Sequence, residues 1–311
     1  MNKTQILTIS EGAAGMKSQI EGLANLIGYP HKNIDLKVSF LFKYLPVQMI
    51  PSSTMIINNL EDFKIETPTI LISCGKKSVK ASIALKKKYK NIFNIHIQNP
   101  KSSYNYFDLI IAPKHDGLNL VNCINTTFAI HNIKFKKKNN LNGKLIINFI
   151  LGGKNKNFKF DKYVQENIHH EINLLSKKYF VRIIPSRRTP NSLIEKFQNE
   201  KINNTELYTN TNDPIKYGNF LCNALANIVT WESISMISEC VYSGVGTFIY
   251  AFEKGRLPKK YENFHKNLIE NKFIKNYSID FKPFNTTIDE DLSELKNKIL
   301  NKINESPTFR T

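Results

Sequence analysis

The stretch that decides the fold is Tyr179-Phe180-Val181-Arg182-Ile183-Ile184-Pro185-Ser186-Arg187-Arg188-Thr189-Pro190. Its apolar beginning is typical of a buried strand, and a helical pattern starts near Pro190. Arg187 and Arg188 therefore follow the carboxyl end of a strand, where open α/β sheets bind ligands. Most other cations of the chain are lysines, whereas guanidinium holds phosphate or carboxylate at two points. We interpret the pair as an anion-recognition site, with a solvated basic turn as the alternative.

The same alternation of strand and helix runs along the whole chain. It predicts an α/β fold of parallel sheets covered by helices. Strands are expected at residues 5–9, 33–38, 69–73, 92–97, 109–112, 145–151, 179–184, 205–208, 227–229 and 247–250, and helices at 18–27, 77–89, 161–178, 190–199, 218–225 and 233–243.

A polar, turn-rich run at residues 134–140 interrupts this alternation. A linker near residues 134–143 would separate two Rossmann-like domains with a cleft between them. We expect a first domain over residues 1–138, a second over 139–285, and a C-terminal helix within 286–311. The helix is indicated by one apolar face, formed by Leu292, Leu295, Ile299 and Ile303.

Charge and cysteine usage narrow the class of protein. The 311 residues carry a net charge of +18, but the lysines are scattered and no nucleic-acid-binding motif is visible, so nucleic acid is not an expected partner. The widely spaced cysteines form no metal-type pair and predict free thiols in a reducing compartment; they are Cys74, Cys123, Cys222 and Cys240. No apolar run is long enough to cross a bilayer. A cytoplasmic protein, soluble or peripheral on the inner membrane surface, is expected.

Two motifs of the second half point to phosphate and sugar. Gly152 and Gly153 follow strand 145–151, and glycines there let backbone amides approach a phosphate; an ordinary strand-to-helix turn is the alternative. Ser233 and Ser235 suit the first turn of a helix, whose free amides attract anions. Glu239 lies on the same helix face one turn deeper, where its carboxylate could accept hydrogen bonds from a sugar diol. The alternative is that Ser233 is only an N-cap.

Three polar clusters of the first half each follow a predicted strand. They are Ser10-Glu11-Gly12-Ala13-Ala14-Gly15-Met16-Lys17-Ser18-Gln19, His96-Ile97-Gln98-Asn99-Pro100 and Pro113-Lys114-His115-Asp116-Gly117. Because the carboxyl ends of parallel strands share one sheet edge, we expect these clusters to line one cleft.

Together these motifs resemble the mitochondrial-fission "elongated mitochondria" family of proteobacteria and plants. The matching pieces run from residue 10 to about 265. They are Ser10-Glu11-Gly12 with Gly15 and Gln19, His96-Ile97-Gln98-Asn99-Pro100, Pro113-Lys114-His115-Asp116-Gly117, Gly152-Gly153, Ser186-Arg187-Arg188-Thr189-Pro190 and Ser233-Ile234-Ser235-Met236-Ile237-Ser238-Glu239.

The resemblance implies a GT-B-like fold, similar to the transferase that adds N-acetylglucosamine to lipid-linked muropeptide, with a nucleotide-sugar in the second domain. It implies phosphate contacts from the two glycines and two serines, ribose contact from Glu239 and neutralisation of the diphosphate by Arg188. We count Arg187 and Thr189 with this nucleotide-sugar site, and expect Gly12, Gly15, Met16, Gln19, His96 and Gln98 to line the cleft.

The chain departs from the family at one position that matters for catalysis. Family members commonly carry histidine where this chain has Met16, and methionine cannot accept a proton. The candidate catalytic residues are therefore Glu11, His115 and Asp116, since a general base must titrate near the working pH. No cofactor or metal is expected, because Arg188 and helix amides can offset the diphosphate charge and no paired-aspartate motif is present.

The sequence thus predicts a GT-B-like protein that binds a nucleotide-diphosphate sugar and transfers the sugar to an acceptor. The alternative is a non-catalytic adaptor that recruits a partner protein at a membrane surface. The segment Phe40-Leu41-Phe42-Lys43-Tyr44-Leu45-Pro46-Val47-Gln48-Met49-Ile50, apolar and flanked by lysines, favours the alternative. Ordinary core packing is the other interpretation of that segment.

Overall fold

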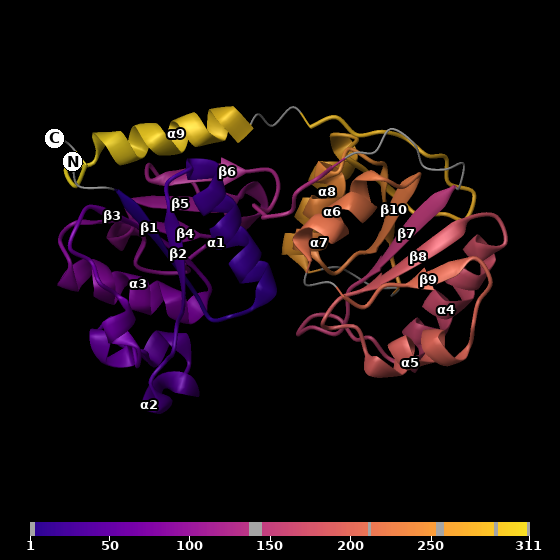
Figure 1. Cartoon of the computed structure of the whole chain (residues 1–311), viewed down its shortest axis with the longest axis horizontal. Coiled ribbons are helices and arrows are strands. Elements are labelled where there is room, and N and C mark those ends of the chain that lie inside the picture. Colours follow the sequence, from indigo (N-terminus) through magenta and orange to yellow (C-terminus); the bar gives the residue numbers. More distant parts are fainter. Residues whose placement is uncertain (1–3, 137–144, 211–212, 253–257, 289–291, 310–311) are drawn as a thin grey trace. The chain divides into compact units, whose positions relative to one another are not determined.

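The computed structural model describes residues 4–136, 145–210, 213–252, 258–288 and 292–309. The chain divides into two compact units (Figure 1). The first contains residues 1–132 together with 290–311, and the second contains residues 133–289. Most of the linker expected at residues 134–143 lies outside the described residues. Most residues of the expected C-terminal helix segment, 286–311, fall within the first unit.

The first unit is built on a six-stranded sheet in which every pair of neighbours is parallel. The strand order is β2-β1-β3-β4-β5-β6. The strands are β1 Gln5–Ser10, β2 His31–Asp35, β3 Thr69–Cys74, β4 Ile92–Ile97, β5 Leu109–Pro113 and β6 Cys123–Thr126, and the helices are α1 Ala14–Ile27, α2 Phe40–Lys43, α3 Lys76–Lys88 and α9 Leu292–Glu305.

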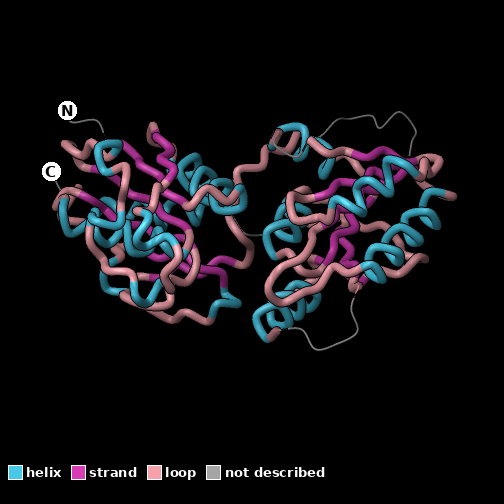
Figure 2. The backbone as a smooth tube through the Cα atoms, turned by 90° about the horizontal axis from the view of Figure 1, so that it is seen from below, coloured by secondary structure: helices cyan, strands magenta, loops and turns pink. Residues whose placement is uncertain are grey.

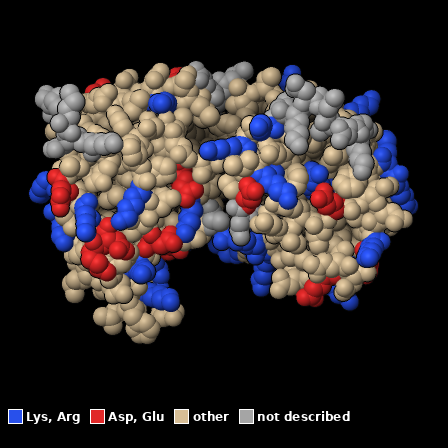
Figure 3. Space-filling view, viewed as in Figure 1, with Lys and Arg blue, Asp and Glu red and all other residues tan. Residues whose placement is uncertain are grey.

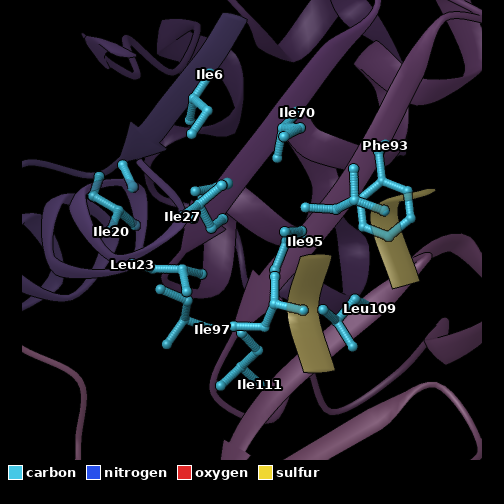
Figure 4. Close-up of a cluster of buried hydrophobic side chains, with 14 of the residues drawn as sticks. Ile6, Ile20, Leu23, Ile27, Ile70, Phe93, Ile95, Ile97, Leu109 and Ile111 are labelled. Carbon is cyan, nitrogen blue, oxygen red and sulfur yellow. The ribbon is translucent and has the colours of Figure 1, made fainter. Parts of the chain in front are cut away.

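Alternation along the central strands supplies a core on each face of this sheet. Ile70 and Ile72 of β3 belong to the core cluster that also contains residues of α1 and α9 (Figure 4). Leu71, between them, joins a second cluster with residues of α3 and of the segment after β2. Burial on both faces explains why every residue of β3 and β4 is buried and why four of the six residues in each strand are apolar.

The second unit repeats the plan with a parallel sheet in the order β12-β11-β10-β7-β8-β9, flanked by helices (Figure 2). Its strands are β7 Ile146–Leu151, β8 Phe180–Pro185, β9 Thr205–Leu207, β10 Ala226–Thr230, β11 Thr247–Tyr250 and β12 Ile274–Asn276, and its helices are α4 Lys162–Ser176, α5 Asn191–Asn199, α6 Pro214–Cys222, α7 Ile234–Tyr242 and α8 Lys259–Glu270.

The predicted α/β class and the parallel sheets are confirmed. The sequence analysis missed β6 and β12, because both are short strands at sheet edges with few buried residues. It also placed one helix at 218–225, whereas α6 begins at Pro214 because the Asp213 carboxylate accepts the amides of Ile215 and Lys216. Within the described ranges, every helix is too short or too polar to span a bilayer.

We predict that Ile299→Ala destabilises the first unit by about 2–5 kcal/mol, because Ile299 is fully buried in the cluster that joins α9 to the sheet. Hydrogen exchange should rise in β1 and β3 and stay unchanged in β7 and β10. Leu292→Ala is the matched control, since Leu292 of the same helix is 43% exposed. Equal protection in both variants would contradict the packing role of α9.

Candidate functional site

The candidate site of the second unit lies where β7, β8 and β10 end. Pairing places Leu151 beside Pro185 and Ile150 beside Val229. The residues that follow these strands therefore lie side by side at one edge of the sheet. They include the two glycines, the arginine pair and the start of α7.

The Gly152–Gly153 turn packs tightly against the segment that follows β10. The Gly152 amide donates to Thr230 Oγ1 at 2.8 Å, and the Gly153 amide donates to Glu232 Oε1 at 2.7 Å. A Cβ on Gly152 would lie 1.5 Å from Glu232 Oε1, and one on Gly153 would lie 1.9 Å from the Arg188 carbonyl oxygen. Glycine is required at both positions because neighbouring chain segments occupy the space of a side chain.

The turn after β8 is anchored by Thr189 and leaves its arginines exposed. Thr189 is buried, with Oγ1 at 2.6 Å from the Gly152 carbonyl oxygen, and it accepts the Ser186 amide at 2.9 Å. Arg187 and Arg188 are exposed, and neither guanidinium forms an ion pair with any acidic side chain that the structure describes. Thr189 therefore positions the turn, while the two arginine side chains remain available to an anion.

Glu232 joins the glycine turn to the start of α7, and the sequence analysis did not select it. The side chain is 1% exposed, and burial raises the pKa of its carboxyl group, while the Gly153 amide and the nearby Arg188 act in the opposite direction. Its Oε2 has no hydrogen-bond partner among the described residues. The signal in the sequence was its place two residues beyond β10, opposite the glycine pair.

The first turn of α7 carries both predicted serines. Ser233 occupies the N-cap position without a side-chain cap hydrogen bond, and Ser235 is partly exposed. The first amides of α7 lack partners within the helix, as at any helix N-terminus. Because Ser233 directly follows Glu232, these amides begin next to the glycine turn.

Glu239 lies deeper on α7 and contacts α6 rather than the glycine turn. The Tyr217 hydroxyl donates to Glu239 Oε2 at 3.3 Å. Burial raises the pKa of the Glu239 carboxyl to about 7 from its ordinary value of 4.5. The carboxylate is thus held by one weak hydrogen bond in a half-buried position.

In the first unit, Glu11 and Met16 lie against the beginning of α3. Glu11 Oε1 accepts the Lys77 amide at 2.7 Å. Gly75 has φ 108°, and a Cβ there would lie 2.9 Å from Glu11 Oε1 and 2.8 Å from Met16 Sδ. The Glu11 carboxylate therefore offsets the positive end of the α3 dipole, which is a structural role. The side chain is nevertheless exposed to solvent.

Gln19 and Gln98 are brought together, with Gln98 Nε2 donating to Gln19 Oε1 at 3.1 Å. His96 differs from the expectation that it lines a cleft, because it is 2% exposed within β4. Its Nδ1 lies 2.8 Å from Ser73 Oγ, and burial lowers the pKa of the imidazole to about 3. His96 therefore remains neutral inside the sheet layer.

The remaining predicted residues of the first unit lie in loops or short turns after strands, or at the start of α1. His115 and Asp116 belong to a 3₁₀ turn, η5 Lys114–Asp116, directly after β5, and both are partly exposed. Gly12 has φ 86° in the loop after β1, and Gly15 lies in the first turn of α1. Among the described residues, no group of three or more His, Cys, Asp or Glu side chains could hold a metal ion.

We predict that Gly152→Ala destabilises the second unit by about 3 kcal/mol or more, because the new methyl group would displace the buried Glu232 carboxylate from its amide donor. Urea unfolding followed by the fluorescence of Trp231, the only tryptophan, reports on this unit. Gly15→Ala is the control, since a Cβ there meets nothing within 4 Å. A Gly152→Ala protein as stable as its parent would contradict the packing.

We predict a pH-dependent difference between the parent and Glu239→Gln. Folding raises the Glu239 pKa, so the folded state holds a proton that the unfolded state releases between pH 4.5 and about 7. Stability contributed by this group is present below pH 4.5 and is lost as the pH rises to 7. Between pH 4.5 and 8, the free energy of unfolding of the variant should therefore rise relative to that of the parent by roughly 3 kcal/mol at most. Urea unfolding across this range checks it, and a constant difference would contradict the raised pKa.

Comparison with known proteins places the chain in a family. A family model described as Mitochondrial fission ELM1 matches residues 14–304. RP120 of Rickettsia prowazekii, an uncharacterized protein, is 27% identical over 314 residues, covering 85% of each chain. The mitochondrial fission protein ELM1 of Arabidopsis thaliana is 22% identical over 254 residues, covering 70% of this chain and 59% of the plant protein.

Solved structures that match the chain over both of its Rossmann-like units have the GT-B fold. MurG of Acinetobacter baumannii superimposes with a TM-score of 0.50 at 11% identity, covering 96% of this chain and 91% of its own. The UDP-GlcNAc 2-epimerase of Neisseria meningitidis, solved bound to UDP-GlcNAc, gives a TM-score of 0.52 at 14% identity, covering 96% of this chain and 100% of its own. These identities are too low to transfer an activity, and the superpositions show the fold alone. The chain is therefore a GT-B-fold member of the mitochondrial fission ELM1 family.

Proposed function

We propose that the second unit binds a nucleoside-diphosphate sugar at the carboxyl ends of β7, β8 and β10. One observation carries the proposal: a buried threonine fixes a turn whose two guanidinium groups are exposed and unpaired among the described side chains, directly beside a glycine turn. Exposed arginines on a rigid, internally bonded turn suit recognition of a planar or tetrahedral anion.

The charges around this edge match a diphosphate. Arg187 and Arg188 supply two cations, and the start of α7 supplies backbone amides and the positive end of a helix dipole. These groups would offset the diphosphate charge without a metal ion. The Gly152 and Gly153 amides, expected to contact phosphate, already donate to Thr230 and Glu232, so the glycines shape this edge without supplying donors to the ligand.

Glu239 is the proposed partner of the ribose. It lies on α7 beyond Ser235, half-buried, and its one side-chain donor among the described residues is the Tyr217 hydroxyl. An ionised carboxylate has further acceptor sites for the two hydroxyl groups of a sugar diol. The N. meningitidis epimerase, bound to UDP-GlcNAc, supports this ligand class for the fold.

Sugar transfer is the second part of the proposal. The bond between the anomeric carbon and the diphosphate oxygen would break, and a bond from that carbon to an acceptor oxygen would form. The acceptor hydroxyl would lose its proton to a base in the first unit, where Glu11, His115 and Asp116 are the candidates. One oxygen of Glu11 is already engaged by the Lys77 amide, which fixes the carboxylate in place.

The adaptor alternative predicts ligand binding or partner recruitment without turnover. Release of UDP from UDP-GlcNAc, measured with and without candidate lipid-linked and soluble acceptors, separates the two. Turnover abolished by Glu11→Gln, with donor binding retained, supports transfer. Binding without turnover on every acceptor supports the adaptor.

We predict that Arg188→Lys weakens the binding of UDP and UDP-GlcNAc by about tenfold or more, because a lost bidentate contact to a charged group costs about 1.5–3 kcal/mol although the charge is kept. Calorimetry or thermal shift measures the change. Lys177→Ala is the control, since this exposed cation lies at the opposite end of the same sheet, before β8. The proposal would be contradicted if Arg188→Lys left binding unchanged, or if the parent bound neither UDP nor UDP-GlcNAc in these measurements.

A further inference from the structure

The segment between β2 and β3 exposes a group of large apolar side chains at one end of the first unit. We call this group the apolar tip. Its members are Phe40 at 77% exposure, Leu41 at 78%, Tyr44 at 77%, Met49 at 67% and Met55 at 73%. They come from α2 and its C-cap residue Tyr44, and from two 3₁₀ turns, η1 Val47–Met49 and η2 Thr54–Ile56. Figure 1 shows α2 projecting beyond the sheet of its unit, and Figure 3 shows the uncharged surface there, bordered by basic side chains.

The apolar tip is held in its exposed position by other residues of the same segment. Other apolar residues of the same segment turn inward: Ile50 and Ile56 are buried in the core beneath α3, and Phe42 packs against that core. Ser39 ties the start of α2 to η2, with its amide donating to the Ile56 carbonyl at 2.9 Å and its hydroxyl to the Met55 carbonyl at 2.7 Å. The inward residues therefore anchor the segment while the tip faces solvent.

The charged residues within the segment that carries the apolar tip are lysines, while Asp35 precedes this segment and Glu61 and Asp62 follow it. Residues 36–60 contain Lys37 and Lys43 and no aspartate or glutamate. The Lys77 ammonium donates to the Lys43 carbonyl oxygen, so α3 brings a third lysine to the base of α2. Lys43 Nζ lies 5.7 Å from the centroid of the Tyr44 ring. On the face that Figure 3 shows, the acidic side chains of this unit lie above its projecting uncharged end and not on it.

We propose that the apolar tip inserts into the interfacial region of an anionic lipid bilayer. Aromatic and long apolar side chains enter the headgroup and upper acyl layers, and lysines at their base remain with the anionic headgroups. The lysines disfavour a basic protein surface, and the large apolar side chains that stand 67–78% exposed beside them favour a bilayer over an acidic protein surface. The proposal uses residues of the first unit alone and does not depend on the nucleotide-sugar site.

Flotation of the full chain with vesicles tests the proposal. We expect binding to phosphatidylcholine vesicles that contain 30% phosphatidylglycerol, about tenfold less binding to phosphatidylcholine alone, and a loss of binding as salt is raised, because salt screens the lysines. The double variant Phe40→Ser, Leu41→Ser should bind the anionic vesicles at least about tenfold more weakly while keeping the thermal stability of the parent.

Three further variants separate insertion from general electrostatic attraction by a protein of net charge +18. Val121→Ser changes an exposed apolar residue of the same unit outside the tip, 97% exposed, and should leave binding unchanged. Phe42→Ser changes the neighbouring inward residue and should lower stability instead. Lys37→Gln with Lys43→Gln should weaken binding to anionic vesicles and reduce its salt dependence.

The depth to which the apolar tip inserts into the bilayer is measured with the variant Leu41→Trp. Brominated acyl chains should quench the new tryptophan, whereas Trp231 of the parent, buried in the second unit, should not be quenched. Absence of flotation by the parent would overturn the proposal. Equal binding by the parent and the Phe40→Ser, Leu41→Ser variant, or a Trp at position 41 that brominated lipid does not quench, would also overturn it and leave surface charge or a protein partner as the occupant.

Discussion

The parallel pairing of neighbouring strands is the constraint on which the rest of this structure depends. In the second unit, pairing of β10 with β7 brings the residues after each strand within hydrogen-bonding distance of one another. Space there is so limited that the Glu232 carboxylate occupies the place of a Gly152 side chain. The glycines, the buried carboxylate and the arginine turn are therefore consequences of one close approach between strand ends.

The first unit has a similar set of contacts where its neighbouring strands end. Ser10 pairs with Cys74, so Glu11 and Gly75 follow their strands side by side. Glu11 accepts the Lys77 amide, as Glu232 accepts the Gly153 amide. In each unit the carboxylate of an acidic residue just after one strand accepts a backbone N–H from the residues that follow the neighbouring strand. In the first unit that N–H belongs to the first turn of α3, and Gly75 beside it has a positive φ that favours glycine. The difference is burial, because Glu232 is enclosed whereas Glu11 is exposed.

The two proposals for this protein use different properties of the two units. The nucleotide-sugar proposal rests on polar groups at strand ends, where rigid pairing fixes their geometry. The bilayer proposal rests on apolar side chains carried by short turns, which are held only by the inward residues of the same segment. A bilayer requires no exact arrangement of contacts, so a patch built from short turns is sufficient for it.

The sequence by itself determined the α/β class, the parallel sheets, the family and most of the strands, because hydrophobic periodicity and local motifs depend on near neighbours in the chain. It also placed the glycine pair and the arginine pair at strand ends. Tertiary structure alone decided that His96 is buried against Ser73, that Thr189 anchors its turn and that Glu232 fills the space above Gly152. It also decided that Phe42 turns inward while Phe40 faces solvent. These outcomes depend on which segments, distant in the sequence, pack against one another. Local sequence patterns do not determine how much space is left for a side chain where such segments meet.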